Sequence, residues 1–482
     1  MISIKSLFKT SLIYGFGSAV VRIMTFALVP LYTNASGAQG EVGWYGYYLL
    51  IFPVIGILRA CYSHGAGDSF LKLYSQSEEK QEIVSTYIIH ITLVTLGISS
   101  ILFGCYLIIP IQPNNSLVGL LQTYFYYIIL IVSFDTINSR LVDILRIKNY
   151  PLYYIIVHIL GQLITILLAI YLVTKQGMGL KGALFALIGG SIITFIMFSP
   201  ILFKFLKIKK FSIKYVKQLF NLGLRFFPAT IFFLIMTQLD RFLLHVLLPE
   251  SESIVGAYGA ATKLASIPML VIGAFNLGWQ PFFLSNGNNQ SAIKKYEKIG
   301  TIFAILIISI AWIVAIIMPL IININIPSIG QVVNIANYPI PIPIIPIIVV
   351  SHIFYALYII NMPPIYVCNK QNWSPIFRMC GAIINLTLNI ILIPHYQMLG
   401  AALATTISYG IMLILLLYKN KKWMPIQLIW QDIILLILIC GISIFYFINQ
   451  SNGQYYVLIS TILYIGFLFY KHGIKNLIIL FK

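Results

Sequence analysis

The sequence predicts an all-α polytopic membrane protein with about fourteen transmembrane helices. Of its 482 residues, 60% are hydrophobic and only 9% are charged, and the mean hydropathy is +0.93. No soluble domain has this composition, and apolar runs long enough to cross a bilayer follow one another along the chain. The net charge of +19 would suggest nucleic-acid binding in a soluble protein, but we attribute it here to lysines in cytoplasmic loops. We therefore expect no nucleic-acid partner.

Fourteen apolar runs of spanning length are separated by polar segments. They cover approximately residues 10–33, 42–63, 83–109, 118–143, 153–174, 181–203, 220–247, 255–283, 299–323, 342–366, 375–393, 398–418, 430–448 and 455–471. The first run is too long for the hydrophobic region of a signal peptide and contains an arginine, so we expect an uncleaved first span. An even number of spans places both termini on one side of the membrane.

The distribution of lysine and arginine predicts which side that is. With the N-terminus inside, the cytoplasmic segments hold 22 of the 31 Lys and Arg residues, only Lys175 and Lys181 lie in opposite loops, and seven lie within spans. This bias predicts a multi-pass protein of the cell inner membrane with both termini in the cytoplasm. The most basic loop, residues 204–218, either lies along the inner leaflet, attracted to anionic lipid, or is an ordinary cytoplasmic linker.

The first span carries a charge at its middle. Gly15, Ser18, Arg22, Thr25 and Val29 recur at steps of three and four residues, so they share one helix face that is small, polar and cationic. A charge at that depth costs at least about 2.5–3.5 kcal/mol, so it should not face lipid. We expect Arg22 to line a watery cavity and to bind substrate there. The alternative is that it pairs with a buried carboxylate and only holds helices together.

The seventh and eighth spans carry charges at a similar predicted depth. Asp240 and Arg241 lie in the outer third of the seventh span, and Lys263 lies in the outer half of the eighth. Asp240 and Lys263 could form a plain ion pair, or a pair that forms in one conformation only and acts as a gate. We expect Asp240 and Arg241 to serve gating or ion coupling, and Lys263 to contribute to substrate binding.

Two further charges lie in the first half of the chain. Arg59, near the inner end of the second span, would add a second cation to the site of Arg22. Asp135 in the fourth span is either a proton or sodium site or the partner of Arg22. We place Arg59 among the expected substrate-binding residues and Asp135 among those for gating or ion coupling.

The two halves of the chain resemble each other. The sequence Gly-Trp-Tyr-Gly at 43–46 opens the second span, and Gly-Ala-Tyr-Gly at 256–259 opens the eighth. Because each half holds six spans, the repeats are parallel, and such halves form two bundles with a substrate cavity between them. The expected domains are a six-helix bundle at 1–203, a basic linker at 204–219, a second six-helix bundle at 220–418 and an additional helix pair at 419–482.

One long stretch resembles a known family. Residues 223–285 are similar to the seventh and eighth helices of polysaccharide-exporting flippases, the Wzx-type (O-antigen) lipid-linked oligosaccharide flippases of the multidrug/oligosaccharidyl-lipid/polysaccharide exporter superfamily. The matching features are Gly223 with Pro228, Asp240-Arg241-Phe242, Gly256-Ala-Tyr-Gly259, Lys263 and Trp279 with Pro281 and Phe282. The arrangement of twelve plus two helices is also similar. The resemblance covers the whole chain, although strong motifs occupy only about an eighth of it, and it implies a MATE-like fold.

The resemblance also implies a function. The expected substrate is an oligosaccharide linked to undecaprenyl diphosphate, moved across the membrane by alternating access for surface polysaccharide biosynthesis. Cations would bind the diphosphate, and aromatic residues such as Trp279 would bind sugars. The expected partners are the polyprenyl-diphosphate-linked glycan, the lipid bilayer, and a polysaccharide polymerase and glycosyltransferases.

Catalysis, cofactors and metals are not expected. The sequence has no P-loop, no G-x-S-x-G and no H-E-x-x-H. Its five cysteines show no paired spacing, and the histidines at 90, 158, 245 and 352 show no ligand spacing. Two alternatives to a flippase remain. An ion-coupled multidrug exporter of the same superfamily would need an acidic cavity, and a membrane glycosyltransferase or polymerase would need acidic motifs or a large external loop.

Overall fold

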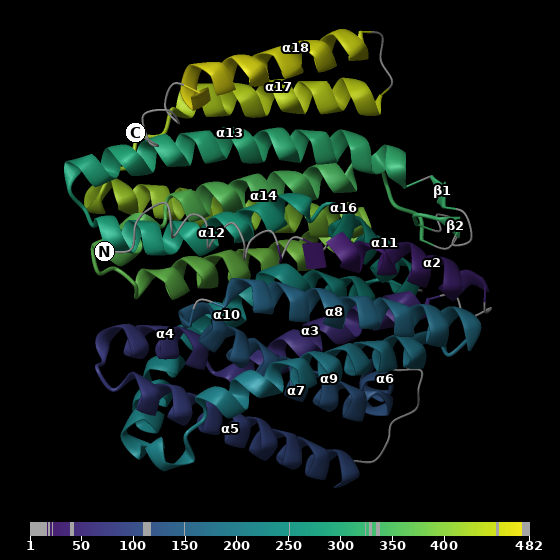
Figure 1. Ribbon diagram of the computed structural model, residues 1–482. Helices are drawn as coiled ribbons and strands as arrows, with labels where there is room; N and C mark the ends of the chain where they lie inside the picture. Colours follow the sequence, from purple (N-terminus) through teal and green to yellow (C-terminus); the bar gives the residue numbers. More distant parts are fainter. Residues whose placement is uncertain are drawn as a thin grey trace. The chain divides into compact units, whose positions relative to one another are not determined.

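The computed structural model describes residues 17, 20–21, 23–38, 43–108, 117–148, 150–249, 251–322, 324–326, 330–333, 338–449 and 453–474. Within these ranges the chain is almost wholly helical (Figure 1). Ten of the described helical segments are long and apolar enough to cross a membrane. The expected all-α membrane fold is confirmed, and about fourteen spans are consistent with it.

The helices of the first half, with their bounds, are α2 (Leu28–Ala38), α3 (Trp44–Ser63), α4 (Ala66–Gln76), α5 (Lys80–Ile108), α6 (Leu117–Thr123), α7 (Phe125–Ile147), α8 (Pro151–Ala169) with the π-helix η1 (Ile170–Lys175), and α9 (Gly179–Phe205). A 3₁₀ turn, η2 (Ile208–Lys210), leads to α10 (Ile213–Leu247).

The second half continues with α11 (Ser251–Leu264), α12 (Ile267–Asn286), α13 (Gln290–Ile321), α14 (Ile344–Ile360), α15 (Pro363–Val367), α16 (Trp373–Trp423), α17 (Trp430–Ile448), α18 (Gln454–Leu468) and the π-helix η3 (Phe469–Ile474). Two short antiparallel strands, β1 (Asn325–Ile326) and β2 (Gly330–Gln331), lie between α13 and α14.

The structure refines three of the predicted spans. The single span expected at 255–283 is two helices, because the chain turns at Ala265 and Ser266 and Pro268 then occupies the first turn of α12. Proline has no backbone N–H, so it suits the start of a helix better than its interior. The spans expected at 375–393 and 398–418 are the two arms of α16, which folds back at Gln397, where φ is 49° and ψ is −125°.

The structure divides into two compact units. The N-terminal unit holds the described residues of 20–242 and 250–256, and the C-terminal unit holds Gly17 and the described residues of 243–249 and 257–474. Contacts between residues define these two units, and they assign most of α10, up to Phe242, to the N-terminal unit. The boundary at 203 was expected from the internal repeat instead. The division into two six-helix bundles, a linker and a helix pair, expected from the sequence, stays a prediction.

The N-terminal unit is built on close helix packing around an apolar core. Residues from α4, α5, α7, α8, α9 and α10 form one buried cluster, which includes Phe70, Tyr87, Ile144 and Phe198. Helices α8 and α9 cross at glycines: a Cβ on Gly190 would lie 1.8 Å from Oγ1 of Thr165. Small residues at such crossings let two helix backbones approach each other, as is common inside membranes.

The C-terminal unit packs α12, α13, α14 and α16 together, with α17 and α18 against α13. Trp312 of α13 donates its indole N–H to Oγ of Ser443 on α17 at 3.1 Å, and this bond is buried. At the far end of the pair, Oδ2 of Asp432 accepts from Nζ of Lys471 at 2.9 Å and contacts Nε2 of His472 at 2.7 Å. Specific polar contacts therefore attach the last two helices to each other and to α13.

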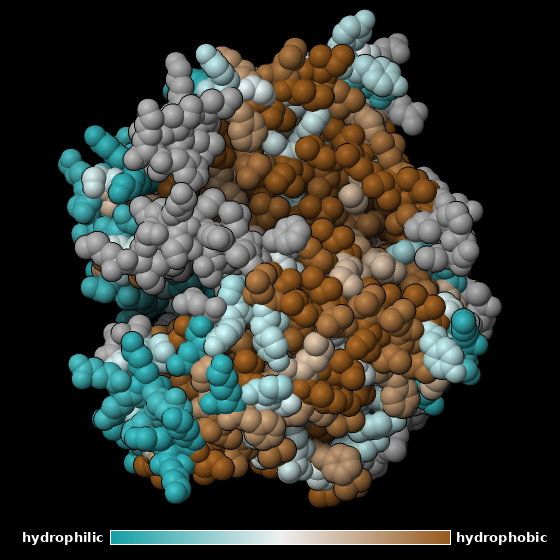
Figure 2. All heavy atoms as spheres, in the orientation of Figure 1, coloured by the Kyte–Doolittle hydropathy of each residue, from teal (hydrophilic) through white to brown (hydrophobic). Residues whose placement is uncertain are grey.

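The surface of the N-terminal unit separates hydrophobic and hydrophilic residues. Hydrophobic residues cover the face formed by α8 and its neighbours, and hydrophilic ones gather at the end that holds α4 (Figure 2). Leu152, Ile156 and Leu167 of α8 are each more than half exposed. Such a face suits lipid.

The basic segment 204–218 lies at this hydrophilic end and is anchored to α5. Ser85 Oγ accepts the backbone N–H of Lys207 at 3.0 Å, and Thr86 Oγ1 accepts that of Ser212 at 3.0 Å. Gln81 donates to the carbonyl of Phe205 at 2.7 Å. These contacts fix the backbone and leave the lysines of the segment exposed, whichever role the segment has.

Candidate functional site: polar groups inside the helical units

The predicted site residues of the first span are only partly visible. Arg22, Gly15 and Ser18 lie outside the described residues, so the role of Arg22 stays a prediction. Of the same helix face, Val29 is fully buried and Thr25 is half-buried.

Arg59 and Asp135 both belong to the N-terminal unit. Arg59 is exposed near the end of α3 and lies within electrostatic range of His158 on α8. Asp135 is half-buried on α7 and accepts a hydrogen bond of 2.6 Å from Oγ of Ser191 on α9. Among the described residues, no ion pair involves Asp135. The predicted role of Asp135 in gating or ion coupling stays a prediction.

The expected charges of the seventh and eighth spans fall in different units. Asp240 is buried on α10, and its Oδ1 accepts the backbone N–H of Arg241. Arg241 donates from Nη1 to Oε1 of Gln238 at 2.9 Å. Lys263 is half-buried on α11 and belongs to the C-terminal unit. The gating pair of Asp240 with Lys263 therefore stays a prediction.

Trp279 is packed inside the C-terminal unit. Its side chain is 2% exposed, and its indole N–H donates to the carbonyl oxygen of Ile359 at 3.1 Å. The ring also lies against Phe275, Phe282 and Tyr296. In this conformation the ring surface is used for packing, so stacking on a sugar would require a rearrangement. The predicted role of Trp279 in substrate binding stays a prediction.

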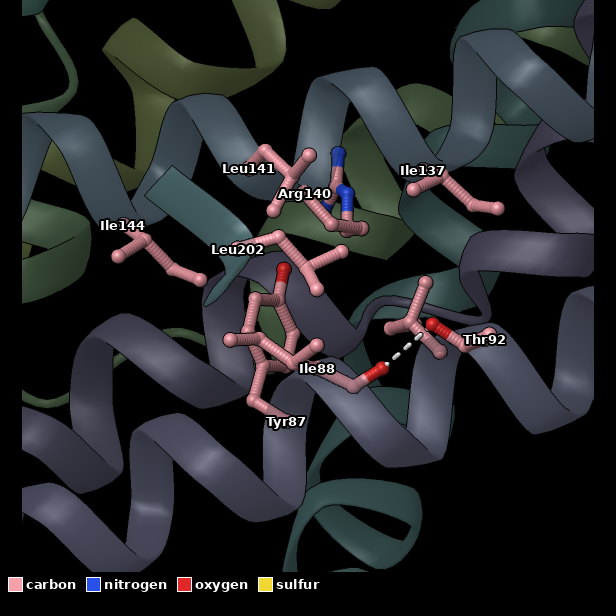
Figure 3. Close-up of a pocket in the computed structure, with 9 residues that line it drawn as sticks. Tyr87, Ile88, Thr92, Ile137, Arg140, Leu141, Ile144 and Leu202 are labelled. Atoms are coloured by element: carbon pink, nitrogen blue, oxygen red, sulfur yellow. Dashed lines mark hydrogen bonds between the residues drawn. The ribbon is translucent and has the colours of Figure 1, made fainter. Parts of the chain in front are cut away.

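A charged cluster that the sequence reasoning left out of the site lies inside the N-terminal unit. Arg140 Nη1 and Asp143 Oδ2 of α7 form an ion pair of 3.2 Å, and the hydroxyl of Tyr87 on α5 donates to the same Oδ2 at 2.8 Å. Figure 3 shows Tyr87 and Arg140 at a small cavity between α5, α7 and α9. The cavity has room for about one water molecule, so it is too small for a headgroup.

The same cluster depends on a glycine. A Cβ on Gly67 of α4 would lie 2.0 Å from Nη1 of Arg140 and 3.0 Å from Oδ2 of Asp143. Any other residue at this position would displace the ion pair or the helix. The short helix α4 therefore closes over the charged pair because residue 67 lacks a side chain.

Two buried histidines lie near this cluster. His64 caps the C-terminus of α3, and its Nε2 lies 2.9 Å from Nε2 of His90 on α5. Both side chains are 6% exposed. The Nδ1 of His64 lies 3.1 Å from the carbonyl oxygen of Tyr62. The charge of Arg140 acts on His64, so the histidines and the ion pair form one polar region.

Helix α3 is held by close backbone contacts at each of its ends. At its start, Gly46 lies against Glu252, and Tyr47 donates from its hydroxyl to Oε1 of Glu252 at 2.9 Å. At its end, a Cβ on Gly65 would lie 2.3 Å from the carbonyl oxygen of Gly223 on α10. Gly46 of the internal repeat and Gly223 of the family-like stretch thus permit contacts that any side chain would prevent.

The C-terminal unit has its own internal cation. Arg378 of α16 lies among the hydroxyl groups of Tyr355, Tyr358 and Tyr366. Arg378 lies near the start of α16, and its side chain is hydrogen-bonded to the hydroxyl of Tyr358. Two phenols belong to α14 and the third to α15, and no local pattern near residue 378 indicates that these helices would supply them.

Sequence signals could have found part of these sites. Arg140 and Asp143 are three residues apart on one helix, a spacing at which opposite charges meet. The histidine pair joins residues 26 apart on two helices, so no spacing rule identifies it. The described residues contain no group of three or more His, Cys, Asp or Glu side chains that could hold a metal ion.

Comparison with known protein families shows to which family the chain belongs. The profile of a family described as "Polysaccharide biosynthesis protein" matches residues 7–286, which is more than half of the sequence. The chain belongs to this polysaccharide biosynthesis family. The match confirms the resemblance noted in residues 223–285. A search of curated proteins found no match.

The fold of this polysaccharide biosynthesis protein is shared by known transporters. An outward-facing multidrug resistance MATE family transporter of the MOP superfamily is 14% identical, with a TM-score of 0.64 over 87% of this chain and 96% of that chain. The lipid II flippase MurJ, in an inward closed conformation, is 17% identical, with a TM-score of 0.60 over 97% and 99%. A MOP superfamily transporter from Pyrococcus furiosus is 15% identical, with a TM-score of 0.56 over 87% and 96%. At these identities the likeness establishes the MATE-like fold.

Proposed function

We propose that this family member is a flippase that moves oligosaccharides linked to a polyprenyl diphosphate across the bacterial cytoplasmic membrane. The observation that carries the proposal is the sign of the charges within the predicted spans. Seven Lys and Arg residues lie there, against four carboxylates, namely Asp135, Asp143, Asp240 and Asp432. A diphosphate needs cations in a water-lined cavity, whereas a cationic drug needs carboxylates.

The family and the fold support the same proposal. Polysaccharide biosynthesis requires lipid-linked glycan to reach the outer leaflet, and a lipid II flippase shares this fold. In our proposal, Arg22, Arg59 and Lys263 bind the diphosphate, and Asp240, Arg241 and Asp135 serve gating or ion coupling. The lipid tail stays in the bilayer while the headgroup crosses. In the same proposal both termini lie in the cytoplasm, because the distribution of lysine and arginine favours that orientation.

The test of the function is the leaflet distribution of lipid-linked glycan in a deletion strain of the native host. Loss of the protein is expected to accumulate glycan on the inner leaflet, and the wild-type gene is expected to restore export. Normal outer-leaflet glycan in the deletion, with raised sensitivity to cationic drugs, would instead indicate the multidrug exporter. A strain without other flippases keeps the result interpretable.

The test of the proposed anion site uses variants in the same assay. Arg22→Ala is expected to abolish export at normal protein level, and Arg22→Lys to retain part of it because the charge is kept. Lys175→Ala is the matched control, since Lys175 is an exposed cation at the end of η1. Full export by Arg22→Ala, in a strain where deletion blocks it, would exclude Arg22 while leaving the flippase function intact.

A further inference from the structure

The contact between His64 and His90 restricts where protons can be. The carbonyl oxygen of Tyr62 can only accept a hydrogen bond, so Nδ1 of His64 must carry a proton to bond it at 3.1 Å. In neutral His64 the Nε2 is then the acceptor, and Nε2–H of His90 must be the donor across 2.9 Å. Both nitrogens of His64 are therefore engaged in one defined tautomer.

This arrangement accommodates one additional proton but not two. If either imidazole gains a proton, the other can still offer one Nε2 lone pair to the shared bond. If both are protonated, two N–H groups face each other with no acceptor between them. Two like charges would then lie in contact inside the protein, where little water screens them. The second proton must therefore separate the rings.

The charges packed around the pair add to this restriction. From α7, Arg140 acts on His64, and its own charge is paired with Asp143 and affected by Asp68 of α4. On α5, the hydroxyl of Tyr87 donates to Asp143, so Tyr87 offers no acceptor to the histidines. From α10, the side chain in contact with His64 is the ring of Phe220, with centroids 5.5 Å apart. The described neighbours thus supply a nearby cation that disfavours a doubly protonated pair.

The pair lies at the point where α3 meets α4 and α10. His64 has a φ of 34° and Gly65 a φ of 75°, so the chain bends here through two left-handed residues. The left-handed conformation costs a non-glycine residue conformational free energy, so surrounding contacts must hold the residue in it. His64 is held by His90, and the carbonyl oxygen of His64 would lie 2.4 Å from a Cβ on Gly223. Moving the His64 ring away from His90 would therefore disturb the contact of this turn with α10.

We propose that His64 and His90 form a proton-binding site that controls the turn between α3 and α4. The pair holds the turn against α10 while at least one facing Nε2 is unprotonated, and it releases the turn when both are protonated. This inference concerns proton binding and the conformation of one turn, so it does not depend on the identity of the substrate.

The direct test is NMR of the full-length protein in nanodiscs with ¹⁵N-labelled histidine, titrated from about pH 8 to about pH 3.5. The lower limit lies below the ordinary range of histidine, because burial and the charge of Arg140 disfavour the second proton. At about pH 8, one proton should lie between the Nε2 atoms of His64 and His90. It should be detected as scalar coupling between the two ¹⁵N nuclei across the hydrogen bond. The coupling should disappear with acid as both rings become imidazolium. Two histidines that titrate independently, with no coupling at any pH, would overturn the proposal.

The variants use residues that fit each position without titrating. Asn is suited to the left-handed conformation of residue 64, and Gln can still hydrogen-bond from position 90. His64→Asn and His90→Gln should each remove the coupled signals, and His352→Gln, at a buried histidine of the C-terminal unit, should leave them unchanged. Loss of the signals in His352→Gln as well would overturn the assignment.

The mechanical part of the proposal is tested by hydrogen exchange at the turn. After correction for the intrinsic pH dependence of exchange, amides of residues 64–69 should lose protection in the wild type on acidification. In His90→Gln the protection should not depend on pH, because no imidazole pair remains to be broken. The same pH-dependent loss in wild type and His90→Gln would show that the pair does not control the turn.

Discussion

The carbonyl oxygen of Glu252 lies where a side chain at position 46 would begin. A Cβ built on Gly46 would come within 2.0 Å of that oxygen and 2.8 Å of the carbonyl carbon. The start of α3 therefore touches the backbone at the start of α11, and the Tyr47 hydroxyl bonds the Glu252 carboxylate beside this contact. Glu252 lies four residues before Gly256, where the segment begins that the internal repeat relates to residues 43–46.

Gly46→Ala is expected to destabilise the protein and to reduce transport. The new methyl group meets backbone, which cannot rotate away, so the two helices must separate or shift. Overpacking of this kind costs about 1–3 kcal/mol. Thermal unfolding of purified protein, followed in detergent, measures the effect.

The matched control for Gly46→Ala is Gly97→Ala on α5. Nothing lies within 4 Å of a Cβ at Gly97, so the substitution adds a methyl group to open space. Alanine is also the better helix former, by up to about 1 kcal/mol. We expect an unchanged or slightly higher melting temperature. Equal losses in the two variants would mean that the contact with Glu252 is not the cause.

Asp143→Ala is expected to destabilise the N-terminal unit strongly. The substitution leaves Arg140 without the carboxylate that pairs with it and leaves the Tyr87 hydroxyl without its acceptor. Removing one partner of a buried ion pair costs about 3–5 kcal/mol, and the lower part of that range applies because the Arg140 side chain is 20% exposed. Expression level and thermal unfolding report the change.

Two comparisons make the Asp143 result specific. Glu82→Ala removes the partner of Lys210 at a surface pair, where the lysine side chain is 54% exposed, and should cost at most about 1 kcal/mol. The double variant Asp143→Leu with Arg140→Met removes both charges and should recover much of the stability lost in Asp143→Ala. A double variant less stable than the single one would show that the ion pair itself contributes stability.

Trp279→Phe separates packing from substrate binding. The substitution removes the hydrogen bond to Ile359, worth about 1 kcal/mol, and some of the contact with neighbouring rings. We expect a lower melting temperature and unchanged transport per folded molecule. A normal melting temperature with weaker substrate binding would favour the binding role predicted from the sequence.

The sequence by itself determined the class of fold, the approximate spans and the family. In a bilayer every backbone polar group must be bonded within its own helix, so long apolar runs have one common solution and local composition reveals it. The family resemblance could also be found in the sequence, because motifs such as those with Gly223, Asp240 and Arg241 are local. The hydropathy of 255–283 hid the break before Pro268, since hydrophobicity does not record where a helix ends.

The tertiary structure decided which polar groups meet. Tyr47 and Glu252 are 205 residues apart, and His64 and His90 are 26 apart on separate helices. Their contacts depend on the rotation of each helix about its axis and on glycines that allow two helices to approach closely. Neither the rotation nor the close approach can be predicted from residue spacing along one helix. Trp279 illustrates the same limit: its sequence context suited a ligand-binding aromatic residue, and only the packing of α12 on its neighbours revealed that its ring is buried.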